Sequence, residues 1–340
     1  MNNKFFDRDD SVLLVLGGLD TSGGMFNYLK AWIHLIQKEC QSVAVCATAE
    51  VLENLKFSGF TIALPYSSND NLKDIYKRLQ FKKYNKEFYE IRKQIDSFLP
   101  SYVHIVDETI FFPQLKSVLS GYEKIITIHD PIYHPGQFRS LMTRILCLYS
   151  RLSYFCTKKL KIHLHSKRSI FPSILSLYGK NVIYPHPLPE TKFSINHHNT
   201  TPVVAFMGRI EKYKGIDLFI QSIQEYEKKY QDAIEILIVG KGEVTGFESL
   251  RFDNRLTIVN EFVSDIQFHK YMSEIDILIL PYISATQSGV GYLAKAYGRK
   301  IVCTDVGNLA DLIESESDGY IVEKNPRIIA NAIHKIASRL

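Results

Sequence analysis

Three cations follow directly on a predicted strand at residues 203–208. The chain continues as a turn that contains Arg209, Lys212 and Lys214, and the turn leads into a predicted helix at 215–230. Open α/β sheets bind their ligands at the carboxyl ends of their strands. Fixed cations there can stabilise a bound anion or negative charge that develops during a reaction. The alternative interpretation is a solvated turn between a strand and a helix.

A second candidate loop joins a predicted strand at 276–281 to a predicted helix at 288–297, and it reads ATQSGVG. Its central residues are Gln287, Ser288, Gly289 and Val290. The first backbone N–H groups of a helix have no partner within the helix, and the helix dipole favours anions there. The loop is therefore a candidate site for an anion and for hydroxyl groups.

Two glycines, Gly23 and Gly24, follow the first predicted strand and open a helix. Because glycine has no Cβ, the N–H groups there can approach an anion closely. The spacing is not the G-x-G-x-x-G of dinucleotide-binding proteins, and Glu50 is a poorly placed match for the acidic residue of that motif. The alternative is a tight turn that only starts the helix.

One histidine, His129, ends a predicted buried strand at 124–129 and is followed by Asp130 and Pro131. A histidine in this position suits a polar contact that lines a ligand-binding cleft. The alternative is a core histidine whose ring nitrogens are satisfied inside the domain.

Short β-branched runs alternate with longer amphipathic stretches along the whole chain. Continuous apolar strands with helices between them predict parallel sheets that are covered on both faces. The other predicted strands are 12–17, 42–48, 60–64, 102–106, 161–165, 181–185, 234–240, 256–259, 300–304 and 319–323. The polar segment 187–202 lacks periodicity and is the predicted linker.

These elements predict an α/β protein with two Rossmann-like doubly wound domains that face a central cleft. A chain of 340 residues is also longer than one hydrophobic core usually supports. We expect an amino-terminal acceptor domain at 1–188 and a donor domain at 189–325. A last helix at 326–340 is expected to pack back on the first domain.

The composition is that of a soluble globular protein, with 46% hydrophobic and 23% charged residues. The five cysteines are scattered without CxxC or zinc-ligand spacing, which predicts reduced core thiols in a cytoplasmic protein. Neither a secretory signal nor an apolar run long enough to cross a bilayer is expected from the sequence.

Charge is unevenly spread. Residues 1–189 contain 24 Lys and Arg against 16 Asp and Glu, and residues 131–189 contain nine cations and no acid. Segment 73–95 adds eight cations and an apolar stripe, which consists of Phe81, Tyr84, Phe88, Ile91 and Ile95. This pattern predicts contact with an anionic membrane surface. The alternative is a stripe that packs on its own domain. Nucleic acid is not an expected partner, because no binding module accompanies the charge.

Several motifs together resemble glycosyltransferase family 4, whose members have the GT-B fold. In the second half these are GRIEKYKGID, LIVGKGE, the strand that ends at Pro281, and KIVCTDVGN; TIHDP, HLHS and YPHP in the first half agree more loosely. The resemblance implies that Arg209 and Lys214 pair with the diphosphate of a UDP- or GDP-sugar. It also implies that Gly24 binds the diphosphate, that His129 contacts the transferred sugar, and that the 287–290 backbone holds sugar hydroxyls and phosphate.

One departure concerns two glutamates that the family usually has in the fourth loop. The matching positions hold Gln287 and Lys295. An amide can still hydrogen-bond a sugar hydroxyl, whereas an ammonium group cannot accept a hydrogen bond, so Lys295 cannot replace the usual ribose contact.

The expected function is a retaining, metal-independent glycosyl transfer. The acceptor would be a glycan or a lipid-diphosphate-linked glycan in cell-surface polysaccharide synthesis. The DRD at 7–9 lies in a polar tail ahead of the first strand and is poorly placed for a metal, so no cofactor is expected. The protein would act in the cytoplasm or on the inner face of the cell membrane. The alternatives are a nucleotide-sugar epimerase of the same fold and an inactive partner subunit that binds sugar nucleotides.

Overall fold

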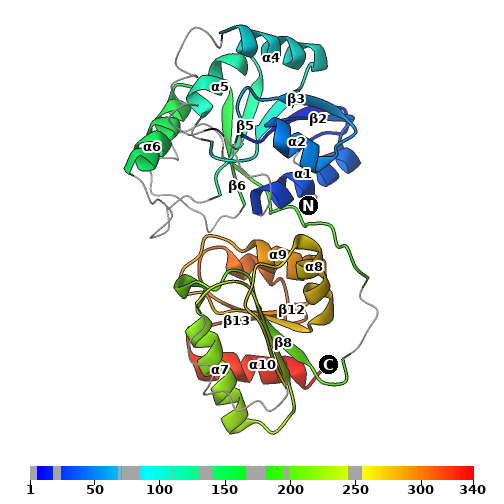
Figure 1. Cartoon of the computed structure of the whole chain (residues 1–340), viewed down its shortest axis with the longest axis vertical. Helices are drawn as coiled ribbons and strands as arrows, with labels where there is room; N and C mark the ends of the chain where they lie inside the picture. The colour runs from blue at the N-terminus through cyan, green and yellow to red at the C-terminus, as the bar shows by residue number, and fades with distance from the viewer. Residues whose placement is uncertain are drawn as a thin grey trace. The chain divides into compact units, whose positions relative to one another are not determined.

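The chain forms two compact units, Met1–Pro187 and Leu188–Leu340, each with its own sheet (Figure 1). We call these two units the first and the second domain. The computed structural model describes residues 6–17, 24–67, 70, 85–109, 111–129, 141–165, 181–194, 199–243 and 255–340.

The first domain contains a seven-stranded parallel sheet in the order β3-β2-β1-β4-β5-β6-β7. Its strands are β1 (Ser11–Val15), β2 (Ser42–Ala47), β3 (Phe60–Ala63), β4 (Tyr102–Ile105), β5 (Glu123–Thr127), β6 (Leu160–Leu164) and β7 (Asn181–Ile183). The described helices are α1 (Gly24–Glu39), α2 (Ala49–Leu55), α4 (Asn85–Phe98), α5 (Phe112–Val118) and α6 (Leu141–Phe155). All seven strands predicted from the sequence of this half are present.

Both faces of this sheet are buried. Leu13 and Val15 of β1 belong to one hydrophobic cluster, which includes residues of α4 and α5. Val12 and Leu14 belong to a second cluster, which includes residues of α1. Successive side chains of a strand point to opposite faces, so a strand covered on both sides reads as a continuous apolar run.

The second domain contains a six-stranded parallel sheet in the order β10-β9-β8-β11-β12-β13. Its strands are β8 (Val203–Met207), β9 (Glu235–Val239), β10 (Leu256–Val259), β11 (Ile277–Leu280), β12 (Lys300–Thr304) and β13 (Gly319–Val322). Its described helices are α7 (Ile216–Lys229), α8 (Asp265–Glu274), α9 (Gly289–Ala296) and α10 (Pro326–Ala337), with a 3-10 turn, η3 (Lys212–Lys214), ahead of α7. The six predicted strands of this half are also present.

The last helix, α10, packs within the second domain. The apolar face of α10, which includes Ile329, Ile333 and Ile336, is buried in the same cluster as Phe219 and Ile223 of α7. Helix α10 therefore completes the core of the second domain. A strongly amphipathic helix shows that one face is buried, but its sequence does not show against which element.

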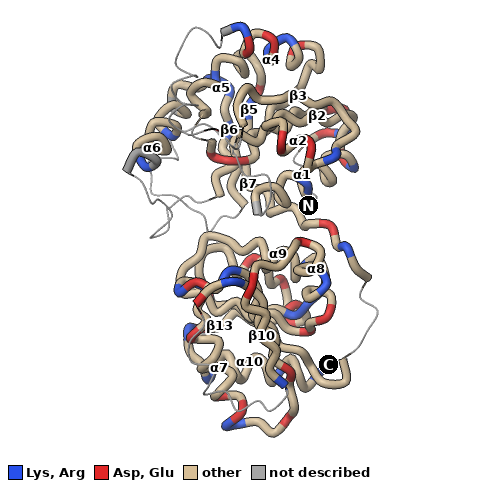
Figure 2. Tube along the Cα trace, viewed as in Figure 1, with Lys and Arg blue, Asp and Glu red and all other residues tan. Residues whose placement is uncertain are grey.

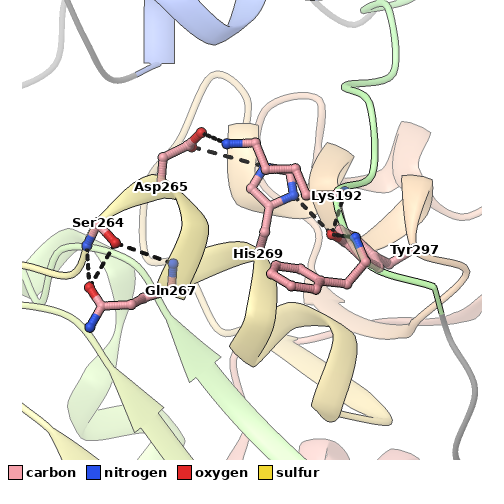
Figure 3. A network of polar contacts seen from close by, with 7 residues as sticks. Lys192, Ser264, Asp265, Gln267, His269 and Tyr297 are labelled. Atoms are coloured by element: carbon pink, nitrogen blue, oxygen red, sulfur yellow. Dashed lines mark hydrogen bonds and ion pairs between the residues drawn. The ribbon is translucent and has the colours of Figure 1, made fainter.

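The start of the second domain is tied to two of its helices (Figure 3). The backbone N–H of Lys192 donates to the Tyr297 hydroxyl at 2.9 Å, and that hydroxyl in turn donates to His269 Nδ1 of α8 at 2.9 Å. The Lys192 side chain pairs with Asp265, and Ser264 and Gln267 form a capping box at the start of α8. These contacts fix where the chain enters the second domain.

None of the five cysteines, all of which lie in the described ranges, forms a disulfide. Cys46 and Cys303 are buried, as expected of core thiols, whereas Cys156 is exposed and departs from that prediction. None of the helices in the described ranges is long and apolar enough to span a membrane.

Candidate functional site

The order of the second sheet reverses between β8 and β11, which are neighbours. The chain moves outward from β8 to β10 and then returns to β11 on the other side of β8. Open α/β sheets bind ligands beside such a point, at the carboxyl ends of the strands. The turn that follows β8 contains the predicted cations, and the loop that follows β11 contains Gln287–Val290. Because β8 and β11 are neighbours in the sheet, the fold brings these two segments together.

The side chain of Lys214 is a buried cation, with 8% of its surface exposed. Its Nζ lies 5.7 Å from the centre of the Tyr282 ring, and it forms no hydrogen bond or ion pair with any residue that the structure describes. Burial, with a smaller contribution from Arg209, lowers the pKa of Lys214 from its ordinary 10.5 to about 8. Burying a charge costs free energy when no ion pair or hydrogen bond compensates it. Lys214 is therefore placed to receive an anion.

Gly208 leaves the space that Lys214 occupies. A Cβ at this position would lie 2.9 Å from Lys214 Nζ and 3.3 Å from Val290 Cγ2, so the turn after β8 is in contact with the start of α9. The φ of Gly208 is +110°, which a residue with a side chain rarely adopts. A side chain at 208 would displace the lysine and strain the turn.

Arg209 lies beside this buried cation but in contact with solvent. Its side chain is 75% exposed, and Nη1 pairs with Glu211 Oε1 at 3.1 Å. An exposed pair of this kind contributes little to stability. Arg209 is therefore free to turn toward a ligand without disturbing the core.

The start of α9 presents backbone donors beside Lys214. Ser288 caps the helix by accepting from the Gly291 N–H at 3.2 Å, and its Oγ is 3.2 Å from the Tyr282 hydroxyl. The N–H groups of Gly289 and Val290 have no acceptor among the described residues. They lie at the positive end of the helix dipole, which favours an anion.

Tyr282 was not selected from the sequence, although it links the two halves of this site. It is buried, lies under Lys214, and contacts Ser288. The available signal was its position directly after Pro281 at the end of β11, but a tyrosine there is as often a core residue as a ligand contact.

The two residues that depart from the family pattern, Gln287 and Lys295, lie in different surroundings. Gln287 is half-buried and precedes the Ser288 cap. Lys295 lies one helical turn or more beyond the start of α9, and its Nζ donates to Glu314 Oε1 at 2.5 Å. Lys295 is thus engaged with a carboxylate of its own domain.

In the first domain, His129 lies at the carboxyl end of β5, as expected. Its Nε2–H donates to the Val106 carbonyl at 2.8 Å, and its ring packs on Tyr28 at 4.5 Å. The ring is half-buried. The local contacts agree with both interpretations of this residue, a cleft contact and a satisfied core histidine. Gly24 begins α1, whereas Gly23 lies outside the described residues.

Around Tyr28 and Trp32 the structure gathers histidines that the sequence did not lead us to group. His104 Nε2–H donates to Thr127 Oγ1 at 2.8 Å, and Thr127 donates to His163 Nδ1 at 2.9 Å. His163 Nε2–H donates to the Tyr184 carbonyl at 3.0 Å, and the lowered pKa of His163 keeps its ring neutral near pH 7. Burial lowers the pKa of His163 to about 3. We refer to His104, His163, His165 and His186 as the histidine cluster.

The remaining members of the histidine cluster are also neutral. Burial lowers the pKa of His186 to about 3, and it lowers the pKa values of His104 and His165 as well. His165 packs among the rings of Tyr28, His163 and His186, and neither of its ring nitrogens has a hydrogen-bond partner in the described part of the chain.

The apolar stripe of segment 73–95 was expected to face a membrane. At the positions that the structure describes, it packs on the core of the first domain. Ile91 and Ile95 of α4 lie in the core, and Phe88 packs against it. For these residues the alternative interpretation is right: the stripe packs on its own domain. Phe81, Tyr84 and the cations Lys77, Arg78, Lys82 and Lys83 lie outside the described residues.

Metal ligands do not cluster in the part of the chain described by the structure: no three His, Cys, Asp or Glu side chains there are arranged to hold an ion. The charged groups around the second-domain site are Lys214 and Arg209, with Glu211 paired to Arg209.

Comparison with known proteins connects this site to a family. Residues 201–339 match the family described as Glycosyl transferases group 1. An uncharacterized glycosyltransferase of Methanocaldococcus jannaschii is 24% identical over 150 residues. That alignment covers 43% of this chain and 38% of the archaeal protein, so the chain spans less than two-fifths of this curated relative.

Solved structures match nearly the whole chain. A glycosyltransferase from Rickettsia africae superposes with a TM-score of 0.62 at 15% identity, covering 97% of this chain and 88% of that one. HepE from Anabaena, solved in complex with UDP-glucose, gives a TM-score of 0.59 at 14% identity, covering 96% and 89%.

The likeness to solved structures shows the fold of the molecule. The two parallel-sheet, Rossmann-like domains form the α/β fold of GT-B glycosyltransferases, as expected from the sequence. The match to the group 1 glycosyl transferases covers the second domain, which contains Lys214 and the start of α9.

Proposed function

We propose that the protein is a retaining glycosyltransferase, similar to family 4, that uses a UDP- or GDP-sugar as donor. The observation that carries the proposal is Lys214, a buried cation that forms no ion pair with any described residue, at the strand-order reversal of the second sheet. HepE, whose fold this chain shares, was solved with UDP-glucose, which supports a nucleotide sugar as the ligand.

The chemistry of the reaction fits these groups. When the bond between the sugar and the diphosphate breaks, negative charge grows on the leaving diphosphate. Lys214 and the Gly289 and Val290 N–H groups supply fixed positive charge on one side of the leaving group, and Arg209 can close over it. These groups replace the metal ion that other transferases use for the same purpose. We therefore propose that transfer does not require a metal.

We assign the acceptor to the first domain, where His129 is the residue that we propose for contact with the transferred sugar. The proposed acceptor is a glycan or a lipid-diphosphate-linked glycan, used on the cytoplasmic side of a membrane in polysaccharide synthesis. The basic character of residues 131–189, which contain no acid, supports an anionic partner.

The proposal is tested by transfer assays with and without chelator. Purified protein, labelled UDP- or GDP-sugars and an extract of lipid-linked glycans should give a labelled product, and excess EDTA should leave the rate within about twofold. Abolition by EDTA with rescue by Mg²⁺ or Mn²⁺ would contradict the metal-free mechanism.

The same assay separates the alternatives. A nucleotide-sugar epimerase would convert the donor without any acceptor. A partner subunit would bind the donor but give neither transfer nor hydrolysis. Either outcome would overturn the proposed transfer while leaving the donor site intact.

A further inference from the structure

Helix α6 of the first domain exposes a row of large apolar side chains. Ile145, Leu148, Tyr149 and Leu152 are each 48–59% exposed. Their spacing of three, one and three residues places them on one face of the helix. Over seven residues the row extends about 10 Å along the axis. We call these four residues the outer face of α6.

The opposite face of α6 is fixed in the domain. Leu146, Ser150 and Tyr154 are buried, and the Ser150 hydroxyl donates to the Thr109 carbonyl at 2.7 Å. Arg151 forms a bidentate salt bridge with Glu108, with both N···O distances at 2.8 Å. The helix therefore cannot rotate to bury the outer face. A helix that is apolar on both sides normally has a partner on each side.

The charge around the outer face indicates the kind of partner. Helix α6 and the turn that follows it contain Arg144, Arg151, Lys158 and Lys159 and no acid, and Figure 2 shows α6 without Asp or Glu. Arg144 and Lys158 are exposed, whereas Lys159 pairs with Glu123. Apolar side chains beside exposed cations match a surface that is negative outside and apolar beneath, as an anionic bilayer is.

We propose that the outer face of α6 docks on an anionic lipid bilayer, with Ile145, Leu148 and Leu152 entering the headgroup region and Tyr149 at its edge. This surface replaces the α4 stripe as the membrane contact. The inference rests on the proposed function only for the lipid-linked acceptor, because docking itself requires neither donor nor transfer. Aromatic rings with a polar tip favour the interface between headgroups and acyl chains.

The test is sedimentation with vesicles of phosphatidylglycerol and phosphatidylcholine, and with vesicles of phosphatidylcholine alone. Wild-type protein should bind the anionic vesicles at least about tenfold more tightly than the neutral ones, and should be released as salt rises. Leu148→Ser with Leu152→Ser should weaken binding to anionic vesicles about tenfold or more. These two side chains are exposed, so the double variant should fold with a wild-type melting curve.

A matched control lies in the second domain, where Phe262 and Ile266 are also exposed. Phe262→Ser with Ile266→Ser should leave vesicle binding unchanged. Donor affinity, measured without vesicles, should be the same in all three proteins, so failure of docking and failure of the donor site are read separately.

Two results would overturn the inference. One is wild-type protein that binds neither kind of vesicle, or binds both equally. The other is a Leu148→Ser, Leu152→Ser variant that binds as the wild type does. A wild-type dimer that this variant dissociates, together with absent vesicle binding, would assign the face to a second copy of the chain instead.

Discussion

Replacing Lys214 with methionine should stabilise the free protein and remove most of its affinity for the donor. Burial lowers the pKa of Lys214 from 10.5 to about 8, so the folded state holds the charged form about 3 kcal/mol less favourably than the unfolded chain does at pH 7. Methionine has similar length and no charge. The melting temperature should therefore rise by about 5–10 °C, measured by calorimetry without ligand.

The same change should weaken donor binding about tenfold to a hundredfold, because charge-assisted hydrogen bonds to the diphosphate are lost. Lys212→Met is the matched control, since Lys212 lies in the same 3-10 turn but is exposed. It should alter neither property appreciably. A Lys214→Met protein that is less stable than wild type would show that this lysine has a structural partner, and unchanged donor affinity would remove it from the site.

Acid should unfold the first domain well before the second. The four residues of the histidine cluster are neutral in the folded state, with pKa values lowered to about 3 for His163 and His186. In the unfolded chain each histidine takes up a proton near pH 6.5. Stability is therefore complete above pH 6.5 and falls as the pH drops from 6.5 toward 3. Each histidine contributes a loss of up to about 1.4 kcal/mol per pH unit.

Summed over the histidine cluster, the free energy of unfolding should fall by about 5 kcal/mol between pH 7.5 and 5.5. The single tryptophan, Trp32, reports this domain alone, because it is buried in the first domain with its ring 4.6 Å from His104. Denaturant titrations followed by its fluorescence give the pH dependence, while circular dichroism also reports the second domain. His165→Phe should reduce the number of protons taken up on unfolding by about one, so the free energy of unfolding should depend less steeply on pH. A stability that is flat across this range would contradict the buried, neutral cluster.

The strands were predictable because their signal is local. A parallel strand that is covered on both faces is a continuous apolar run, and segments such as residues 203–208 and 276–281 show it without reference to the rest of the chain. The alternation with helices predicts parallel sheets but not the order of their strands. The structure supplies that order, and it places the turn after β8 beside the loop after β11.

Burial of particular side chains was not predictable in the same way. The sequence treated Arg209 and Lys214 as equals, yet one is exposed and the other is enclosed beneath Gly208 and above Tyr282. The difference arises from a glycine with φ of +110° and from a residue more than sixty positions away. Burial that depends on packing between distant residues produces no periodic pattern in the sequence.

The amphipathic helices illustrate the same limit. The stripe of α4 was recognised in the sequence, but the described part of it packs on its own domain. The last helix was expected without its apolar face, which packs in the core of the second domain. Helix α6 has apolar residues on both its buried and its exposed side, so its sequence does not show which side packs on the domain. Only the buried contacts of Ser150 and Tyr154 show which side remains exposed.

The central claim, that Lys214 binds the donor diphosphate, is tested most directly by a thermodynamic cycle. UDP and UMP, and GDP and GMP, are titrated calorimetrically into wild type and into Lys214→Met. In the wild type we expect the preferred diphosphate to bind at least about tenfold more tightly than its monophosphate. In the variant this ratio should fall toward one. A ratio that is the same in both proteins would show that the diphosphate binds elsewhere.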